Sequence, residues 1–209
     1  MSPLLISFIG ILLVPLFVAS WRLSVFGLAG QGLLMAWISY QLDPSLDSVS
    51  AWLGLFDLVV VRGMFAPFAL YAVLRSQHAP ARNDVLPPNL MSWTLAIVLV
   101  LVAFRFADML VPVEGNEQAF VAAATAGLLL GLLVLATQTG PFSQMIGALR
   151  IENAIALFEL GRRHRDADIA MQIAQTLILI ATVLMFRWYL RTLPRAHATK
   201  VSAVEGGTT

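Results

Sequence analysis

The chain has 209 residues, of which 59% are hydrophobic and 12% are charged, and its formal net charge is +1. Soluble domains carry roughly 25% charged residues, so this composition predicts an integral membrane protein. The lipid bilayer is therefore one expected partner. The near-neutral charge argues against a nucleic-acid partner. Because the chain has no cysteine, disulfides, iron–sulfur clusters and thiolate metal sites are excluded.

Seven apolar stretches follow one another, and each is about long enough to cross a bilayer. They cover residues 3–20, 23–41, 51–74, 90–112, 119–138, 142–160 and 168–190. The sequence therefore predicts an all-α, polytopic membrane bundle of about seven transmembrane helices. The first stretch lacks the basic leader and cleavage pattern of a secretory signal, so we expect a retained helix.

The distribution of basic residues predicts an orientation for this bundle. If seven helices alternate in direction, one side receives Arg22, Arg75, Arg82, Arg187, Arg191, Arg195 and Lys200. The positive-inside rule makes that side cytoplasmic, with the N-terminus outside and the C-terminus inside. The loop at Arg162–Arg165 breaks the pattern, and two explanations stay open: a partner covers it, or the number of helices differs.

Two further patterns concern packing rather than chemistry. Trp21, Trp52, Trp93 and Trp188 lie near helix ends, where indole rings settle at the headgroup level. Ala123, Gly127 and Gly131 form a ridge of small residues at four-residue spacing, for which we favour packing within the chain over assembly with another chain.

No cofactor is expected from the histidines. His78, His164 and His197 all fall in connecting or tail segments, so a haem held between two helices has no ligands there. We likewise predict no metal site.

Ionisable residues inside the predicted sixth helix are the main functional candidates, since charges at bilayer depth are costly and usually mark an ion or proton path. Glu152 and Glu159 are seven residues apart and share one helix face. We predict a proton relay at this pair, although Glu159 lies near the helix end and an interfacial role stays open. Arg150 is two residues from Glu152 and does not face it, so we interpret it as a modulating charge, while Asn153 adds a neutral polar group to the path.

The predicted third and fourth helices also carry charges, which we interpret as modulating groups. Asp57 and Arg62 are five residues apart, so on an α-helix each needs a partner on another helix. Arg105 and Asp108 are three apart, which predicts an ion pair within one helix. Pro67 lacks a backbone donor and is expected to kink the third helix near Arg62.

The last predicted helix carries uncharged polar residues at about one-turn spacing: Gln172, Gln175 and Thr176. They either extend a hydrogen-bonded polar path or only bind helices together. We favour the second interpretation.

Three segments resemble component E of hydrogenase-4, a membrane subunit of complex-I-like assemblies. They are Arg22–Ser24 with Gln31 downstream, the run RGMFAP from Arg62 to Pro67, and Met145–Gly147 followed by Ile151–Asn153. The resemblance covers most of the chain, and its most specific part is the Glu152–Asn153 pair.

This resemblance implies three regions: a four-helix membrane region at 1–115, a three-helix region at 116–193 similar to the small K-type subunit of complex I, and a polar, flexible tail at 194–209. It implies a non-catalytic subunit of an oxidoreductase complex in a bacterial-type plasma membrane, which takes part in proton or sodium translocation. The implied partners are antiporter-like subunits and a hydrogenase-like or dehydrogenase-like redox module.

The chain departs from the family pattern at three places. The glutamate of the K-type subunit falls at Leu149, so Glu152 takes its role one turn later. Relatives carry a lysine where this chain has Arg62, which stays protonated and so cannot pass a proton. An acidic group in the last helix is replaced by Gln175 and Thr176.

Two other classes of function remain open. The chain is a non-conducting scaffold if its buried charges serve only assembly, or it is a stand-alone membrane carrier. A retinal protein is excluded because the only lysine, Lys200, lies in the polar tail. The sequence shows no zinc-protease motif and no nucleotide-binding glycine loop.

Overall fold

The structure is a computed structural model and describes residues 3–17, 21–76, 90–111, 115–138, 140–162 and 169–192. Within these ranges the chain is helical apart from short connections, and no strand occurs. The elements are α1 (Pro3–Phe17), α2 (Trp21–Leu42), α3 (Val49–Phe56), the π-helix η1 (Asp57–Phe65), α4 (Ala66–Ser76), α5 (Leu90–Leu110), α6 (Asn116–Thr137), α7 (Pro141–Arg162) and α8 (Ile169–Thr192). The all-α prediction is confirmed for the described residues.

Five helical stretches in the described part of the chain are long and apolar enough to cross a membrane. They are Arg22–Leu42, the continuous α3–η1–α4 stretch at Val49–Arg75, Leu90–Leu110, Asn116–Thr137 and Ile169–Thr192. Their number supports a multi-pass membrane protein. The shorter α1 and the more polar α7 occupy the other two predicted stretches.

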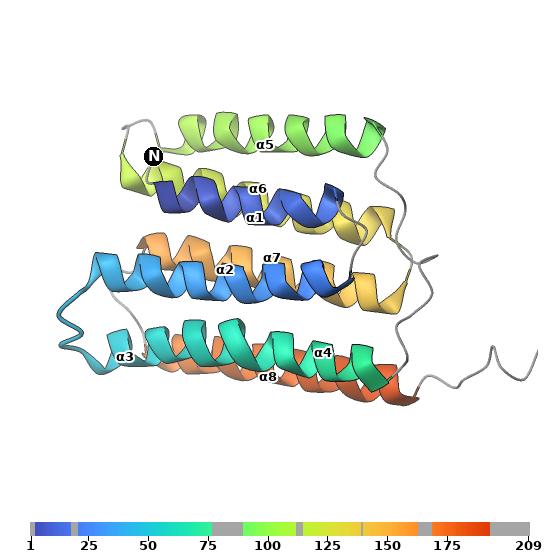
Figure 1. Cartoon of the computed structure of the whole chain (residues 1–209). Helices are drawn as coiled ribbons and strands as arrows, with labels where there is room; N and C mark the ends of the chain where they lie inside the picture. Colours follow the sequence, from blue (N-terminus) through green and yellow to red (C-terminus); the bar gives the residue numbers. More distant parts are fainter. Residues whose placement is uncertain are drawn as a thin grey trace, which may run out of the picture.

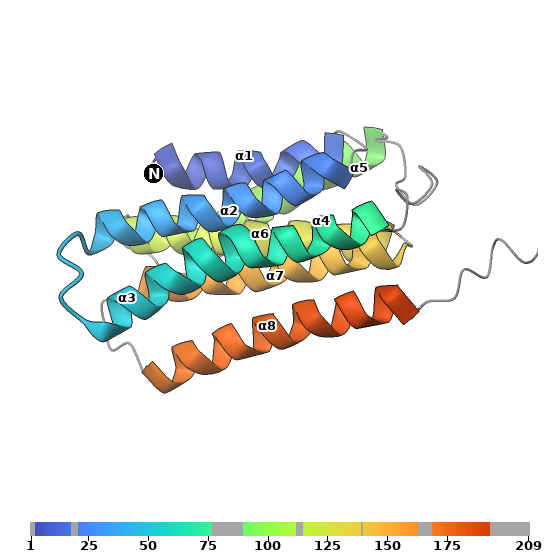
Figure 2. The same cartoon turned by 60° about the horizontal axis from the view of Figure 1, so that its bottom comes forward.

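The long helices lie side by side and run in alternate directions along the chain (Figure 1). In α6, 67% of the central residues are buried, against 17% in α5 and 11% in α8. Figure 1 shows α5 at one edge of the bundle, and Figure 2 shows α8 at another. Apolar side chains on α5 and α8 therefore face outward, as expected for helices that meet lipid or other proteins.

The ridge of small residues on α6 allows α7 to pack closely against it. A Cβ atom added to Gly131 would lie 2.7 Å from Cγ1 of Ile151, and one added to Gly127 would lie 3.0 Å from Cβ of Ala154, both on α7. Packing within the chain is therefore confirmed as the use of this ridge.

Helices from both sides of residue 115 form one bundle. α1 packs against α6, and α2 packs against α7. The largest apolar core joins Phe8 of α1, Met35 of α2, Leu130 of α6 and Leu157 of α7, all fully buried. Residues 194–209, His78, His164, His197, Arg82 and residues 163–165 lie outside the described part.

The two ends of the bundle differ in charge. Arg22, Arg75, Arg187 and Arg191 lie at the end where α2 begins and α4 and α8 finish, which we call the basic end. Asp43, Asp47 and Glu117 lie at the opposite, acidic end. Trp52, Trp93 and Trp188 are exposed near helix ends, in line with the predicted headgroup positions.

Candidate functional site

The first half of the site lies on η1, where the chain departs from α-helical geometry. Nε of Arg62 donates to Oδ2 of Asp57 at 2.8 Å, and this is the one ion pair found among the described residues. Asp57 and Arg62 each also bind another helix, as predicted, but their pairing with one another was not expected from α-helical spacing. In a π-helix the backbone bonds join residues i and i+5, which brings side chains five apart onto one side.

Local sequence accounts for part of this distortion. η1 ends directly before Ala66 and Pro67, and the backbone N–H of Ala66 donates five residues back to the carbonyl of Val61. Pro67 has no N–H to continue a regular ladder, so the strain expected beside it is taken up by π-helical turns. π-helical turns occur frequently at functional sites.

Two glycines bring η1 against α2. A Cβ atom added to Gly32 would lie 2.6 Å from the backbone nitrogen of Gly63 and 2.7 Å from the carbonyl carbon of Arg62. The two backbones therefore touch beside the ion pair, and no larger residue fits at Gly32 without moving η1.

From η1 the site continues onto α7 and α2. Nη1 of Arg62 donates to the backbone carbonyl of Glu152 at 3.0 Å and to Oδ1 of Asn153 at 3.2 Å. Nδ2 of Asn153 donates to Oε1 of Gln31 at 3.2 Å. Gln31, Arg62 and Asn153 are all buried. A polar network thus joins three helices about halfway along their length, surrounded by apolar side chains.

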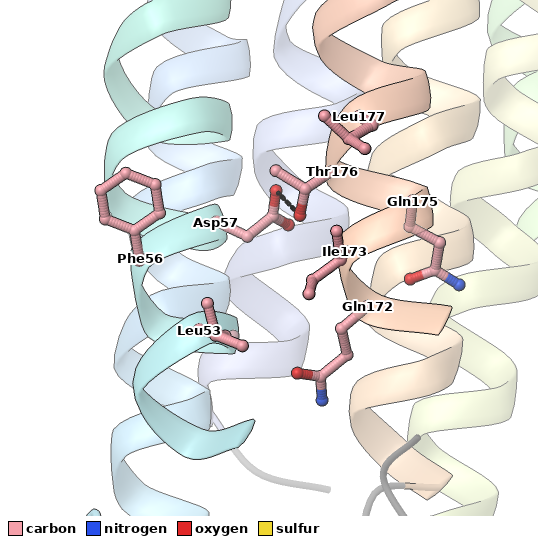
Figure 3. A pocket seen from close by; sticks show the side chains of 9 residues that line it. Leu53, Phe56, Asp57, Gln172, Ile173, Gln175, Thr176 and Leu177 are labelled. Carbon is pink, nitrogen blue, oxygen red and sulfur yellow. Dashed lines mark hydrogen bonds between the residues drawn. The ribbon is translucent and has the colours of Figure 1, made fainter. Parts of the chain in front are cut away.

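A fourth helix reaches the network across a cleft. Oγ1 of Thr176 on α8 donates to Oδ1 of Asp57 at 3.0 Å, and Figure 3 shows these two side chains pointing toward one another. The cleft has a volume of about 190 Å³ and is lined by α3, η1 and α8. The exposed side chains of Phe56, Ile173 and Leu177 flank it, so Asp57 lies just beneath the bundle surface.

Other polar contacts extend from this cleft toward the acidic end. Gln172 donates to the hydroxyl of Ser50 at 2.8 Å. Gln175 donates to Glu159 on α7. Each of the three polar residues predicted on the last helix therefore binds another helix. This agrees with the interpretation that they hold helices together. Together with the bond from Thr176 to Asp57 they form a polar line of three separate contacts between α8 and its neighbours, from the acidic end to Asp57.

Glu152 occupies a different surface from the rest of the network. Its backbone carbonyl accepts from Arg62, but within the described residues no hydrogen bond or ion pair reaches its carboxylate. The side chain is half-buried and lies beside exposed Ile155 on the outer face of α7. The carboxylate of Glu152 thus lies on the outer face of the bundle, about halfway along α7. Lipid would surround it there unless protein or water covers it.

Arg150 is the largest fully buried side chain of the described residues, with 1% of its surface exposed. Its Nε and Nη2 atoms find no acceptor, and the hydroxyl of buried Ser143 is likewise unpartnered. No carboxylate in the described part of the chain lies within ion-pair distance of it. An arginine keeps its charge even when buried, so water or an anion must satisfy these donors.

The predicted ion pair between Arg105 and Asp108 does not form. Both side chains are exposed on α5, and Asp108 accepts instead from Gln118 of α6 at 2.9 Å. The pairing was expected from spacing alone, but Asp108 binds a donor on the neighbouring helix instead. These two residues lie far along the chain from the network and contribute nothing to it.

Thr176→Val tests the link between α8 and Asp57. The change keeps the shape of the side chain but removes the hydroxyl, so we expect the free energy of unfolding in detergent to fall by about 1 kcal/mol. Thr182→Val, at a half-buried position on the same helix, is the control. An equal loss in both variants would show that the hydrogen bond to Asp57 contributes no stability of its own.

No metal site or relative adds to this description. Among the described residues, no group of three His, Asp or Glu side chains is arranged to hold a metal ion. Comparison with family models, with curated proteins and with solved structures gives no match for this chain. Sequence reasoning missed Ser50 as the partner of Gln172 and Ser143 as a buried hydroxyl, because single serines are common in membrane helices and carry no signal.

Proposed function

We propose that the chain is a membrane-arm subunit of a complex-I-like, hydrogenase-4-type respiratory complex, and that it passes protons to a neighbouring subunit. The observation that carries the proposal is the position of Glu152. It is a half-exposed carboxylate at mid-depth, directly joined through its own backbone to a buried network of Arg62, Asp57, Asn153 and Gln31. Such groups within membrane helices are characteristic of proton and ion pathways.

The network supports a relay in a specific way. Arg62 is permanently charged and makes three hydrogen bonds, so it holds Asp57 and the Glu152 turn of α7 in place without exchanging protons itself. The polar contacts between α8, α3 and α7 lead from the acidic end toward Asp57. In this proposal Glu152 is the exchanging group, Asp57 and Arg62 set its electrostatic surroundings, and Glu159 with Gln175 lies on the approach.

The position of Glu152 on the outer face of α7 favours a subunit of a larger assembly over a stand-alone carrier. A carboxylate on the outer face of α7 costs several kcal/mol against lipid, and a covering protein removes this cost. We propose antiporter-like membrane subunits as the covering partners, with a redox module attached through them, in a bacterial-type plasma membrane. The basic end is then the cytoplasmic side, and the N-terminus is outside.

Glu152→Gln tests the proposal because it preserves size and hydrogen bonding but removes the exchangeable carboxyl. We expect redox-driven proton translocation to fall at least about tenfold while the assembly stays intact. The measurement is dye-reported acidification of inverted membrane vesicles energised in turn with formate, hydrogen and NADH. Glu117→Gln, at an exposed carboxylate of the acidic end, is the control. Full translocation by an assembled Glu152→Gln complex would remove this residue from the path.

A non-conducting scaffold is the second candidate, and it is favoured by the satisfied Asp57–Arg62 pair, whose contacts join η1 to α7 and α8. For a scaffold, Glu152→Gln should disrupt assembly rather than translocation. A compensating change on the partner's helix should then restore the complex.

A further inference from the structure

A second buried polar line leads away from the network toward the basic end, along the seam between α2 and α7. Both helices run from the basic end to the acidic end, and they are held in register by the hydrogen bond between Gln31 and Asn153. Seven residues before Gln31 on α2 is Ser24, which is therefore level with residue 146 of α7. On α7, Ser143 and Arg150 are seven residues apart and share one face.

Along this α2–α7 seam (Ser24, Gln31, Ser143, Arg150 and Asn153), buried polar groups follow one another every three or four residues. At a rise of about 1.5 Å per residue, neighbouring levels are about 5 Å apart. All five residues are buried, with 9% or less of their surface exposed. Nitrogen atoms of Arg150 and Gln31 and the hydroxyl of Ser143 lack partners, a combination that is normally satisfied by internal water.

The polar line toward the acidic end carries carboxylates, whereas the α2–α7 seam carries a positive charge. All carboxylates in the described part of the chain lie at mid-depth or in the acidic half, whereas the half between the network and the basic end holds none. Arg150 is the ionisable group on the seam, and nothing within the described residues neutralises it. A buried, permanent positive charge repels hydronium and other cations, as arginines do in selective water pores.

We propose that the α2–α7 seam holds water and that Arg150 closes it to cations. Protons that reach the network from the acidic end are thereby kept from crossing to the basic end. This inference rests on the proposed conduction of protons, and it adds a residue that prevents leakage. Arg150 acts through its charge and does not itself exchange protons.

Arg150→Met removes the charge and the unpartnered donors but keeps a long, unbranched side chain. We expect passive proton leak, driven by a potassium diffusion potential across vesicles that contain the full assembly, to rise about tenfold. Arg150→Lys keeps the charge and should leak no more than the unaltered chain. An unchanged leak in an assembled Arg150→Met complex overturns the proposal. Because this readout needs no redox reaction, it is independent of the Glu152→Gln result.

Should Arg150→Met fail to assemble, a density map of the unaltered assembly in lipid nanodiscs decides the question. Ordered water at Nε and Nη2 of Arg150, continuing toward Ser143, is the expected result. A bound inorganic anion or a carboxylate of another subunit at these atoms overturns the proposal, because the charge would then be neutralised and could not act as a barrier.

Discussion

Asp57→Asn is expected to lower the free energy of unfolding by about 3–5 kcal/mol, the largest loss for any single change discussed for this chain. Asparagine has the size of aspartate and can still accept from Thr176. The loss therefore reports the charge alone: without Asp57 the guanidinium of Arg62, whose side chain is 2% exposed, is left buried with no counter-ion. Unfolding of the purified chain in detergent, followed by tryptophan fluorescence, gives the measurement.

Two variants make this prediction specific. Asp47→Asn removes an exposed carboxylate at the acidic end and should change stability by less than about 0.5 kcal/mol. Arg62→Gln combined with Asp57→Asn removes both charges, so it should recover part of the loss. A single Asp57→Asn variant as stable as the unaltered chain would show that the ion pair within η1 contributes no stability of its own.

Gly32→Ala is expected to be the second most damaging change, with a loss of about 1–3 kcal/mol from one added methyl group. The new Cβ would lie 2.6 Å from the backbone of Gly63, and backbone cannot rotate away as a side chain can. Moving η1 outward also lengthens the bonds from Arg62 to the Glu152 carbonyl and to Asn153. We therefore expect a lower melting temperature together with weaker proton translocation.

Gly30 supplies a matched control two residues away on the same helix. A Cβ atom there meets its nearest neighbour, Cδ1 of Ile11, at 3.5 Å, which is ordinary van der Waals contact. Gly30→Ala should be neutral or slightly stabilising, since alanine favours the helix. Equal losses from Gly30→Ala and Gly32→Ala would mean that close packing of α2 and η1 has no special role.

Most of the helical architecture could be predicted from the sequence, because apolar stretches of about 20 residues leave few alternatives to membrane helices. Asp57, Arg62, Glu152 and Asn153 could also be singled out as candidates, since polar residues among apolar ones stand out. The sequence did not reveal how these residues pair with one another. This pairing depends on the π-helical turns of η1, which no periodicity revealed, and on a contact between Gln31 and Asn153 across 122 positions of sequence.

Residue spacing was misleading where another helix competes for the same group. Arg105 and Asp108 have the spacing of an ion pair, yet Asp108 binds Gln118 of α6. The role of Arg150 illustrates the opposite case. Its position in the sequence gave no sign that two of its nitrogen atoms remain unpartnered in the interior, because this depends on which side chains of other helices surround it.

The most direct test asks what covers the outer face of α7 beside Glu152. A photoreactive amino acid placed at Ile155, which is 43% exposed and lies three residues from Glu152, samples this surface in native membranes. The account predicts a covalent adduct with a different integral membrane protein, identified by mass spectrometry. Adducts with lipid alone, or with a second copy of this chain, would contradict the claim that Glu152 passes protons to a partner subunit.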